Sequence, residues 1–174
     1  MFTIPINLVY NKILNYLTTL KGLRTVKNDY LVLGDKEALV KIEVFLNYAC
    51  PYCATFYELV DTILPPYIEN KQVVVVVKHY DKPREMLLPG TLINANLDYS
   101  QPEKTLEIIS KLFKEQSTWD KFSSHKIKKY IEEKYGLEEQ FSNIDRSLLI
   151  TAEAIDRNVK MVPTVFINES EFQY

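Results

Sequence analysis

The stretch VKIEVFLNYACPYC, residues 40–53, decides the fold of this 174-residue chain. Its first half, 40–46, is apolar and rich in β-branched side chains, which indicates a buried strand. A helical pattern then runs from Tyr52 to Leu64 and ends at Pro65-Pro66. Residues 72–78 contain five consecutive valines, a run typical of a strand buried on both faces. Strand, helix and strand within about forty residues predict a βαβ unit with parallel strands.

Cys50 and Cys53 are the two cysteines of the chain, and they lie between the first strand and the helix. Unpaired backbone N–H groups and the positive end of the helix dipole stabilise an anion at such a position. We therefore expect Cys50, at the helix cap, to lose its proton readily and act as a nucleophile, with Cys53 as the resolving thiol. Pro51 suits the first helical position, because its missing N–H would have no partner there.

Two other interpretations of the cysteine pair stay open. One is half of a zinc site, with His79 and His125 as further ligands, although these histidines lack the short spacing of a zinc finger. The other is a pair of unreactive core cysteines. The position between a strand and a helix favours redox chemistry over both, so we expect no metal site and no cofactor.

The composition is that of an ordinary globular protein. Hydrophobic residues make up 47% and charged residues 25%, and a net charge of −2 produces no field that would attract nucleic acid. The partly apolar segment 6–20 is too short and polar to cross a bilayer, and it lacks the flanks of a signal peptide. We therefore expect a cytoplasmic protein with no nucleic-acid and no membrane partner, although a mature exported chain would look the same.

Hydrophobic spacing and turn residues predict the remaining elements. They are an amphipathic helix at 5–21, a short strand at 30–33, helices at 102–115, 124–135 and 144–158, and a strand at 163–168. The helix after the cysteines is expected to bury Phe56, Leu59, Val60 and Ile63. The last helix is expected to bury Leu148, Ile150 or Thr151, and Ile155.

Three motifs resemble those of the DsbA-like branch of the thioredoxin superfamily. The proteins of this branch are thiol–disulfide oxidoreductases. The three motifs are residues 44–49 leading into Cys50-Pro51-Tyr52-Cys53, a Leu-Phe-x-x-Gln-x-x-Trp pattern at 112–119, and Val-Pro-Thr-Val-Phe-Ile at 162–167. The resemblance implies an α/β, thioredoxin-like fold with a helical insertion between the βαβ unit and the cis-proline strand. The implied organisation is an N-terminal helical extension at 1–29, a thioredoxin-like domain formed by 30–90 and 159–174, and an inserted helical subdomain at 91–158.

The resemblance also implies roles for individual residues. In that family the first cysteine is the exposed nucleophile, the second resolves the mixed disulfide, and a cis-proline loop packs beside them. These roles carry over to Cys50, Cys53 and a cis Val162–Pro163 bond. The implied substrate-binding residues are Val162, through its backbone, Pro163, Pro51 and Tyr52. The implied partners are protein or peptide thiols and disulfides, together with an upstream redox partner.

Two alternative functions remain. Cys-Pro-Tyr-Cys is also the motif of glutaredoxins, which are glutathione-linked reductases with a much shorter domain, whereas 109 residues separate Cys53 from Pro163 here. The second alternative is a non-enzymatic adaptor that senses redox state. Its partner-binding surface would change when the disulfide forms. The direction of exchange (oxidase, reductase or isomerase) depends on the potential and the compartment.

The sequence departs from the family in three places, one of which is the additional helix at 5–21. Val44 lies six residues before the first cysteine, where many relatives carry a buried acid, and Glu43 faces the other side unless the strand shifts its register. Nothing ionisable would then lie under Cys53. The chain also ends soon after the cis-proline strand, which leaves 169–174 for a last strand and none for a final helix. Either helix 5–21 covers the bare surface, or the chain is a shortened form.

The remaining candidates are histidines and aromatic residues. We expect His79 and His125 to be structural or solvated rather than catalytic. An apolar rim around the cysteines would suit binding of unfolded peptide, although Phe56 fits the core better. The expected rim consists of Tyr48, Tyr52, Phe56, Tyr57 and Met161.

Overall fold

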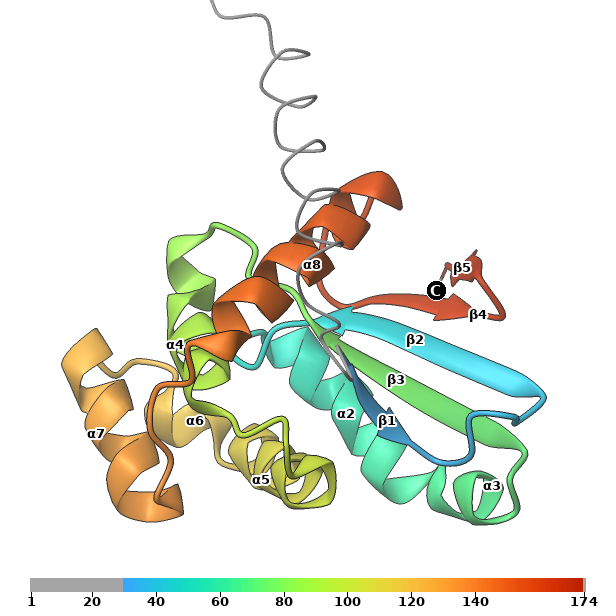
Figure 1. The fold of residues 1–174 in the computed structure, drawn as a ribbon, viewed down its shortest axis with the longest axis horizontal. Coiled ribbons are helices and arrows are strands. Elements are labelled where there is room, and N and C mark those ends of the chain that lie inside the picture. Colours follow the sequence, from blue (N-terminus) through green and yellow to red (C-terminus); the bar gives the residue numbers. More distant parts are fainter. Residues whose placement is uncertain (1–29, 174) are drawn as a thin grey trace, which may run out of the picture.

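The computed structural model describes residues 30–173, and Figure 1 shows their fold. Their strands form one sheet in the order β1-β3-β2-β4-β5. The strands are β1 (Leu31–Leu33), β2 (Val40–Leu46), β3 (Val73–His79), β4 (Thr164–Ile167) and β5 (Ser170–Phe172). Strands β2 and β3 are parallel, and the other neighbouring pairs are antiparallel. The helix predicted at 5–21 lies outside the described residues.

The central pair of strands confirms the predicted βαβ unit. Every residue of β3 is buried, as its run of valines indicated. The pairing of β2 with β3 is continuous over all seven residues of each strand, with Leu46 opposite His79. Because side chains alternate along a strand, Val44 and Glu43 face opposite sides of the sheet. The register shift that would bring Glu43 under the cysteines does not occur.

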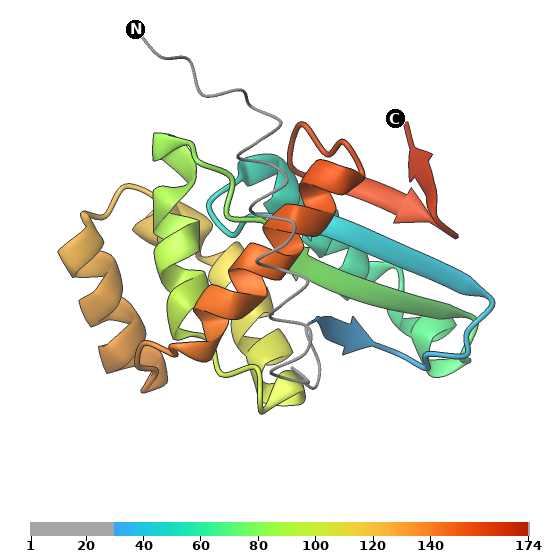
Figure 2. The same cartoon turned by 45° about the horizontal axis from the view of Figure 1, so that its top comes forward.

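Most of the helices lie between β3 and β4 in the chain, as the resemblance implied. Two helices come before β3, namely α2 (Pro51–Thr62) and α3 (Pro65–Glu69). Those between β3 and β4 are the 3-10 helix η1 (Glu85–Leu87), α4 (Leu88–Asn96), α5 (Pro102–Lys114), α6 (Gln116–Trp119), α7 (Ser124–Tyr135) and α8 (Ser142–Asp156). Figures 1 and 2 show α4 to α7 gathered beside one end of the sheet and α8 crossing a face of it. Within residues 30–173, no helix has the length and apolar character needed to cross a bilayer.

The helix boundaries follow from local chemistry. The Ser123 side chain accepts a hydrogen bond from the backbone N–H of Lys126 and caps α7, which ends where Gly136 adopts a left-handed φ of 64°. Sequence spacing predicted α2, α5, α7 and α8 to within two residues at each end. It did not predict α4, because Pro89 and Gly90 in its first turn indicate a loop rather than a helix.

Two apolar clusters pack on opposite faces of the sheet. On one face, Val44 packs with Val73, Val75 and Val77 of β3 against α2 and the helices beyond it. On the other, Phe45 and Phe166 pack against Ile150 and Ala154 of α8. The sheet is therefore covered on both sides, which explains why its central strands lack a polar face.

The predicted buried faces of two helices were partly wrong. Helix α2 buries Cys53, Tyr57 and Val60, whereas Leu59 and Ile63 are exposed. Cys53 packs into the core cluster, and the helical period places Tyr57 and Val60 on the same buried face. The same period turns Leu59 outward. Helix α8 buries Ile150 as predicted. The other residues it buries are Asn143, Arg146 and Ala154, and it exposes Leu148 and Ile155.

Candidate active site

Cys50 is the N-cap residue of α2, as predicted. Its backbone is extended (φ −83°, ψ 120°), and Pro51 is the first residue of the helix. Cys53 lies one turn into the helix and is fully buried, and Cys50 is also buried, at 6% exposed, so the exposed first cysteine that the resemblance implied is not found. The backbone N–H groups of Cys53 and Ala54 donate to the carbonyl oxygen of Cys50, which begins the helix directly after the strand and its loop.

The loop before β4 reaches the same place from the far end of the chain. The Val162–Pro163 peptide bond is cis, as predicted. The Sγ atom of Cys50 donates to the carbonyl oxygen of Val162 at 3.3 Å. Pro163 is buried, Val162 is half-buried, and Thr164 holds the loop by donating to the carbonyl oxygen of Met161 at 2.8 Å. The structure therefore brings together the cysteines and the cis-proline loop that sequence placed 109 residues apart.

The surroundings of Cys50 favour its thiolate. The hydrogen bond from the Cys53 thiol has the largest effect on the pKa of Cys50 and lowers it; burial opposes this, and the backbone N–H groups of Cys53 and Tyr52 lower it further, to about 6. Burial instead raises the pKa of Cys53 strongly, and the hydrogen bond to Cys50 adds to that effect. Cys50 is thus suited to attack, and Cys53 keeps its proton until a later step.

A polar residue of the family-like motif at 112–119 holds the active-site loop. The side-chain Nε2 atom of Gln116 donates to the carbonyl oxygens of Tyr48 at 2.6 Å and Cys50 at 3.1 Å. Trp119 is fully buried, and its indole N–H donates to the carbonyl oxygen of Leu112. Sequence reasoning used this motif for the resemblance but assigned no role to Gln116.

Gly90 in α4 lets that helix approach the same loop. A Cβ atom at this position would lie 2.1 Å from Oδ1 of Asn47 and 2.6 Å from the backbone nitrogen of Ala49. Any side chain here would therefore displace the residues that lead into Cys50. The close contact with the active-site loop therefore requires glycine at position 90, the residue that made α4 resemble a loop in the sequence.

The predicted apolar rim is only partly present. Tyr52 and Met161 are exposed, at 76% and 66%, and lie beside Cys50 and Val162 along the chain. Tyr48 and Tyr57 are fully buried and belong to the core, so their assignment to the rim was wrong. Phe56 is half-buried and packs against the same core, which agrees with the preference for a core role.

The two histidines have different surroundings. His125 is exposed at the start of α7, whereas His79 is fully buried at the end of β3, so the expectation of a solvated residue fits His125 alone. Within residues 30–173, no three His, Cys, Asp or Glu side chains are grouped so that they could hold a metal ion.

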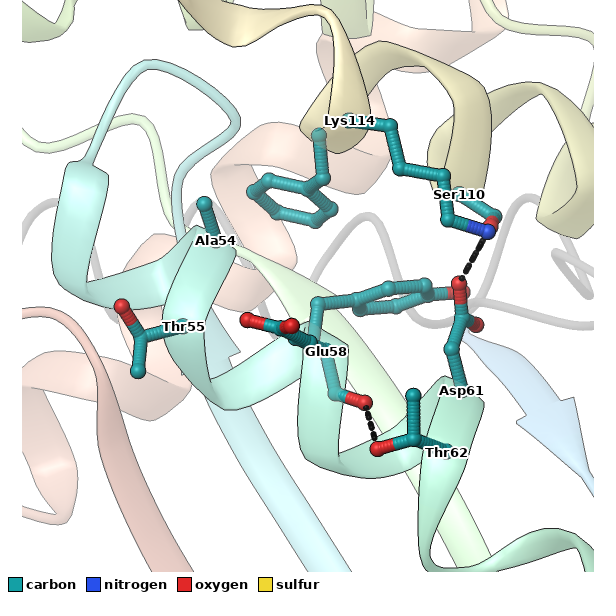
Figure 3. Close-up of a pocket in the computed structure, with 9 residues that line it drawn as sticks. Ala54, Thr55, Glu58, Asp61, Thr62, Ser110 and Lys114 are labelled. Atoms are coloured by element: carbon teal, nitrogen blue, oxygen red, sulfur yellow. Dashed lines mark hydrogen bonds and ion pairs between the residues drawn. The ribbon is translucent and has the colours of Figure 1, made fainter.

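A separate pocket of about 380 Å³ lies between α2 and α5 (Figure 3). Asp61 of α2 lines this pocket and contacts two residues of α5. The ammonium group of Lys114 lies 3.0 Å from its carboxylate, and the Ser110 hydroxyl donates a hydrogen bond to it. Its lining includes Ala54 and Thr55 but no residue of the cysteine pair or of the cis-proline loop. The cysteine chemistry therefore does not take place in this pocket.

The pH dependence of alkylation tests the difference between the two thiols. In the reduced protein, the rate of Cys50 alkylation by iodoacetamide should rise with pH through a midpoint near 6, because the thiolate is the reactive form. Cys53 should stay unlabelled over the same range. Timed labelling followed by mass spectrometry measures both rates. Rapid labelling of Cys53 in native wild-type protein would overturn the assignment.

The site consists of two cysteine thiols at a helix start beside a cis-proline loop, on a thioredoxin-like α/β fold. A family model described as thioredoxin matches residues 26–174, and the chain belongs to this family. No curated protein matched. The similar solved structures include a conserved protein of unknown function from Enterococcus faecalis V583, with 30% identity, a TM-score of 0.77, and coverage of 88% of this chain and 86% of that one.

Two further structures carry DsbA-like or oxidoreductase descriptions. MdbA, a thiol–disulfide oxidoreductase from Corynebacterium diphtheriae, is 19% identical, with a TM-score of 0.64 and coverage of 86% of each chain. Wolbachia pipientis alpha-DsbA1 is 19% identical, with a TM-score of 0.65 and coverage of 84% of this chain and 78% of that one. The fold is therefore the DsbA-like one, and the comparisons support thiol–disulfide oxidoreductase activity in general.

Proposed function

We propose that this protein exchanges a Cys50–Cys53 dithiol or disulfide with protein and peptide substrates. The observation that carries the proposal is the contrast between the two sulfurs. Cys50 lies at the start of α2 with its pKa lowered to about 6, and its sulfur is 3.3 Å from the carbonyl oxygen of Val162, while Cys53 is fully buried and burial raises its pKa. A two-step exchange requires one sulfur that attacks the substrate and a second that resolves the mixed disulfide.

Exchange proceeds in two steps, one for each cysteine. The Cys50 thiolate attacks one sulfur of a substrate disulfide, forms a mixed disulfide, and releases the other substrate sulfur as a thiolate, which takes a proton from water. Cys53 then loses its proton and attacks the Cys50 sulfur. The Cys50–Cys53 disulfide forms, and the second substrate sulfur leaves with the electron pair. The reverse sequence oxidises a substrate dithiol.

The reactive surface suits an extended polypeptide. Tyr52 and Pro51 are exposed on one side of Cys50, and the half-buried Val162 offers its backbone on the other. Pro163 is buried, so its ring does not face solvent, and it belongs to the loop that positions Val162. We assign Val162, Pro51 and Tyr52 to substrate contact, and Pro163 to the loop that supports it.

The lowered pKa of Cys50 also bears on the direction of exchange. A stabilised thiolate favours the reduced protein, which makes the disulfide form a stronger oxidant than an unperturbed pair. Donation of the disulfide to substrate dithiols is therefore the direction that the site favours. Whether this occurs depends on an upstream partner that reoxidises the pair and on the compartment, for which the cytoplasm stays a prediction.

Trapping tests the proposal. In Cys53→Ser, the second step is removed, so the reduced variant should accumulate a one-to-one mixed disulfide with a peptide that contains a disulfide. Mass spectrometry of non-reduced samples measures the adduct. The double variant Cys50→Ser/Cys53→Ser is the control and should form none. Adducts with glutathione disulfide but none with peptides would favour the glutaredoxin-like alternative and contradict the proposal.

A further inference from the structure

His79 is a buried titratable group that the proposed reaction does not yet use. It lies opposite Leu46 at the end of the parallel pair, and thus at the same edge of the sheet as the cysteines. Its side chain is 0% exposed, and its ring centre lies 4.1 Å from that of Tyr48. Among the described residues, its Nδ1 atom has no hydrogen-bond partner. A buried polar atom without a partner is costly and points to a function.

The other ring nitrogen, Nε2, faces a donor and an acceptor at once. The amide Nδ2 of Asn47 lies 3.3 Å from it, and Oδ1 of Asp81 lies 3.0 Å from it. The Asn47 amide is oriented by its other partners, because Oδ1 accepts from Ala49 N–H and Nδ2 faces the carbonyl oxygen of Tyr80. An unprotonated Nε2 can accept from Asn47, whereas a protonated one donates to Asp81.

Asn47 also contacts the resolving thiol. Its backbone N–H donates to Sγ of Cys53 at 3.4 Å, a contact that opposes the effect of burial on the thiol. Val44, on the cysteine side of β2, is apolar, and Glu43 faces the other side of the sheet. The hydrogen bonds therefore link Cys53 to a titratable side chain through Asn47, and that side chain is His79.

We propose that His79 and Asp81 form a buried acid–base pair that sets, through Asn47, how readily Cys53 becomes a thiolate. The inference rests on the proposed function and deepens it. His79 is a positioning residue, because it acts on the sulfur through Asn47. Protonation adds a positive charge to a poorly solvated region, where charges interact strongly, and ends the acceptance by Nε2 from Asn47. It thereby changes the residue whose backbone N–H donates to the Cys53 sulfur, in the direction that favours a thiolate.

The surroundings of Asp81 support its carboxylate form. Asp81 accepts hydrogen bonds at Oδ2 from Asn94 and Ser147. Burial opposes ionisation of Asp81, but the charge of His79 and hydrogen bonds from His79 and Ser147 keep its pKa below the ordinary value. The other titratable or charged groups that face this region are Tyr48 after β2, Cys53 on α2, Tyr99 after α4 and Arg146 on α8.

Stopped-flow reaction with 5,5′-dithiobis(2-nitrobenzoate) separates the two steps. Attack by Cys50 releases one thionitrobenzoate, and attack by Cys53 on the Cys50 sulfur releases the second. His79→Gln keeps a hydrogen-bond acceptor for Asn47 but cannot hold a charge. We expect the second release to slow about tenfold at neutral pH, with its pH profile moved up by about one unit, and the first release to stay unchanged.

Three controls make the result decisive. His125→Gln, on the exposed surface, should leave both steps unchanged. Asn47→Ala should slow the second release, and adding His79→Gln to it should slow that release no further, because the two act in series. A folded His79→Gln variant with the wild-type profile overturns the inference. Should that variant not fold, an unchanged second release in Asn47→Ala overturns it instead. A wild type that releases no second thionitrobenzoate counts against the proposed function.

Discussion

Cys50→Ser is expected to reduce disulfide exchange by at least about three orders of magnitude, as removal of a nucleophile does in other enzymes. A serine hydroxyl stays protonated at neutral pH and does not attack a disulfide. Cys53 cannot replace it, because it is fully buried and burial raises its pKa. The loss should therefore appear in the first chemical step, before any mixed disulfide forms.

The same variant should fold as well as the wild type. Cys50 occupies the N-cap of α2, a position that serine favours, and the hydroxyl can donate to the carbonyl oxygen of Val162 as the thiol does. We expect the free energy of unfolding of the reduced protein to change by less than about 1 kcal/mol. Peptide-disulfide turnover and urea unfolding measure the two effects. Thr55→Ala, on the exposed side of α2, is the control, and turnover by folded Cys50→Ser would contradict the assignment.

Lys78→Met is expected to lower the free energy of unfolding by about 3 kcal/mol or more, because it removes the fully buried cation from beside the buried carboxylate of Glu43. The Lys78 ammonium lies 2.6 Å from a carboxylate oxygen of Glu43 and 2.6 Å from one of Glu153. Arg157 lies 3.2 Å from each carboxylate, and the more exposed Lys41 lies 3.1 Å from Glu43, so these two cations compensate only part of the lost charge. Lys78 and Glu43 are almost completely buried, so solvent cannot replace the lost interaction.

Urea unfolding of matched variants measures this effect. Lys129→Met removes an exposed ion pair with Glu133 and should cost less than about 0.5 kcal/mol. Lys78→Met/Glu43→Leu should recover much of the loss, because no buried charge is then left unpaired. A Lys78→Met effect as small as that of Lys129→Met would show that the buried cluster contributes little.

Acid titration gives an independent check on the same cluster. Burial opposes ionisation of Glu43, but hydrogen bonds from Lys78 and Lys41 hold its pKa at about 2, below the ordinary 4.5. This depressed pKa stabilises the fold above pH 4.5, and the stabilisation is lost as pH falls from 4.5 toward 2. Without Lys78 the pKa of Glu43 rises, so the loss should be smaller.

The elements around the cysteines were predictable because their signals are local. A β-branched run, a proline directly after Cys50 and a helical period define strand, motif and helix within a short span of chain. The valines of β3 indicated burial on both faces, and Gly136 indicated the end of α7. The sequence around residue 50 therefore contained the position of Cys50 at the helix start, one turn before Cys53, whose thiol has the largest lowering effect on the pKa of Cys50.

The tertiary structure decided which distant groups meet the two sulfurs. The contact of Cys50 with Val162 joins residues 112 apart, and Gln116 reaches the active-site loop from 66 residues beyond Cys50. His79 looked like a structural or solvated residue, because nothing local shows that Asn47 and Asp81 enclose it. Such contacts depend on how α4 and α8 pack against the strand ends. Hydrophobic spacing shows that a helix has a buried face but not what that face will touch, because packing across the chain determines its partner.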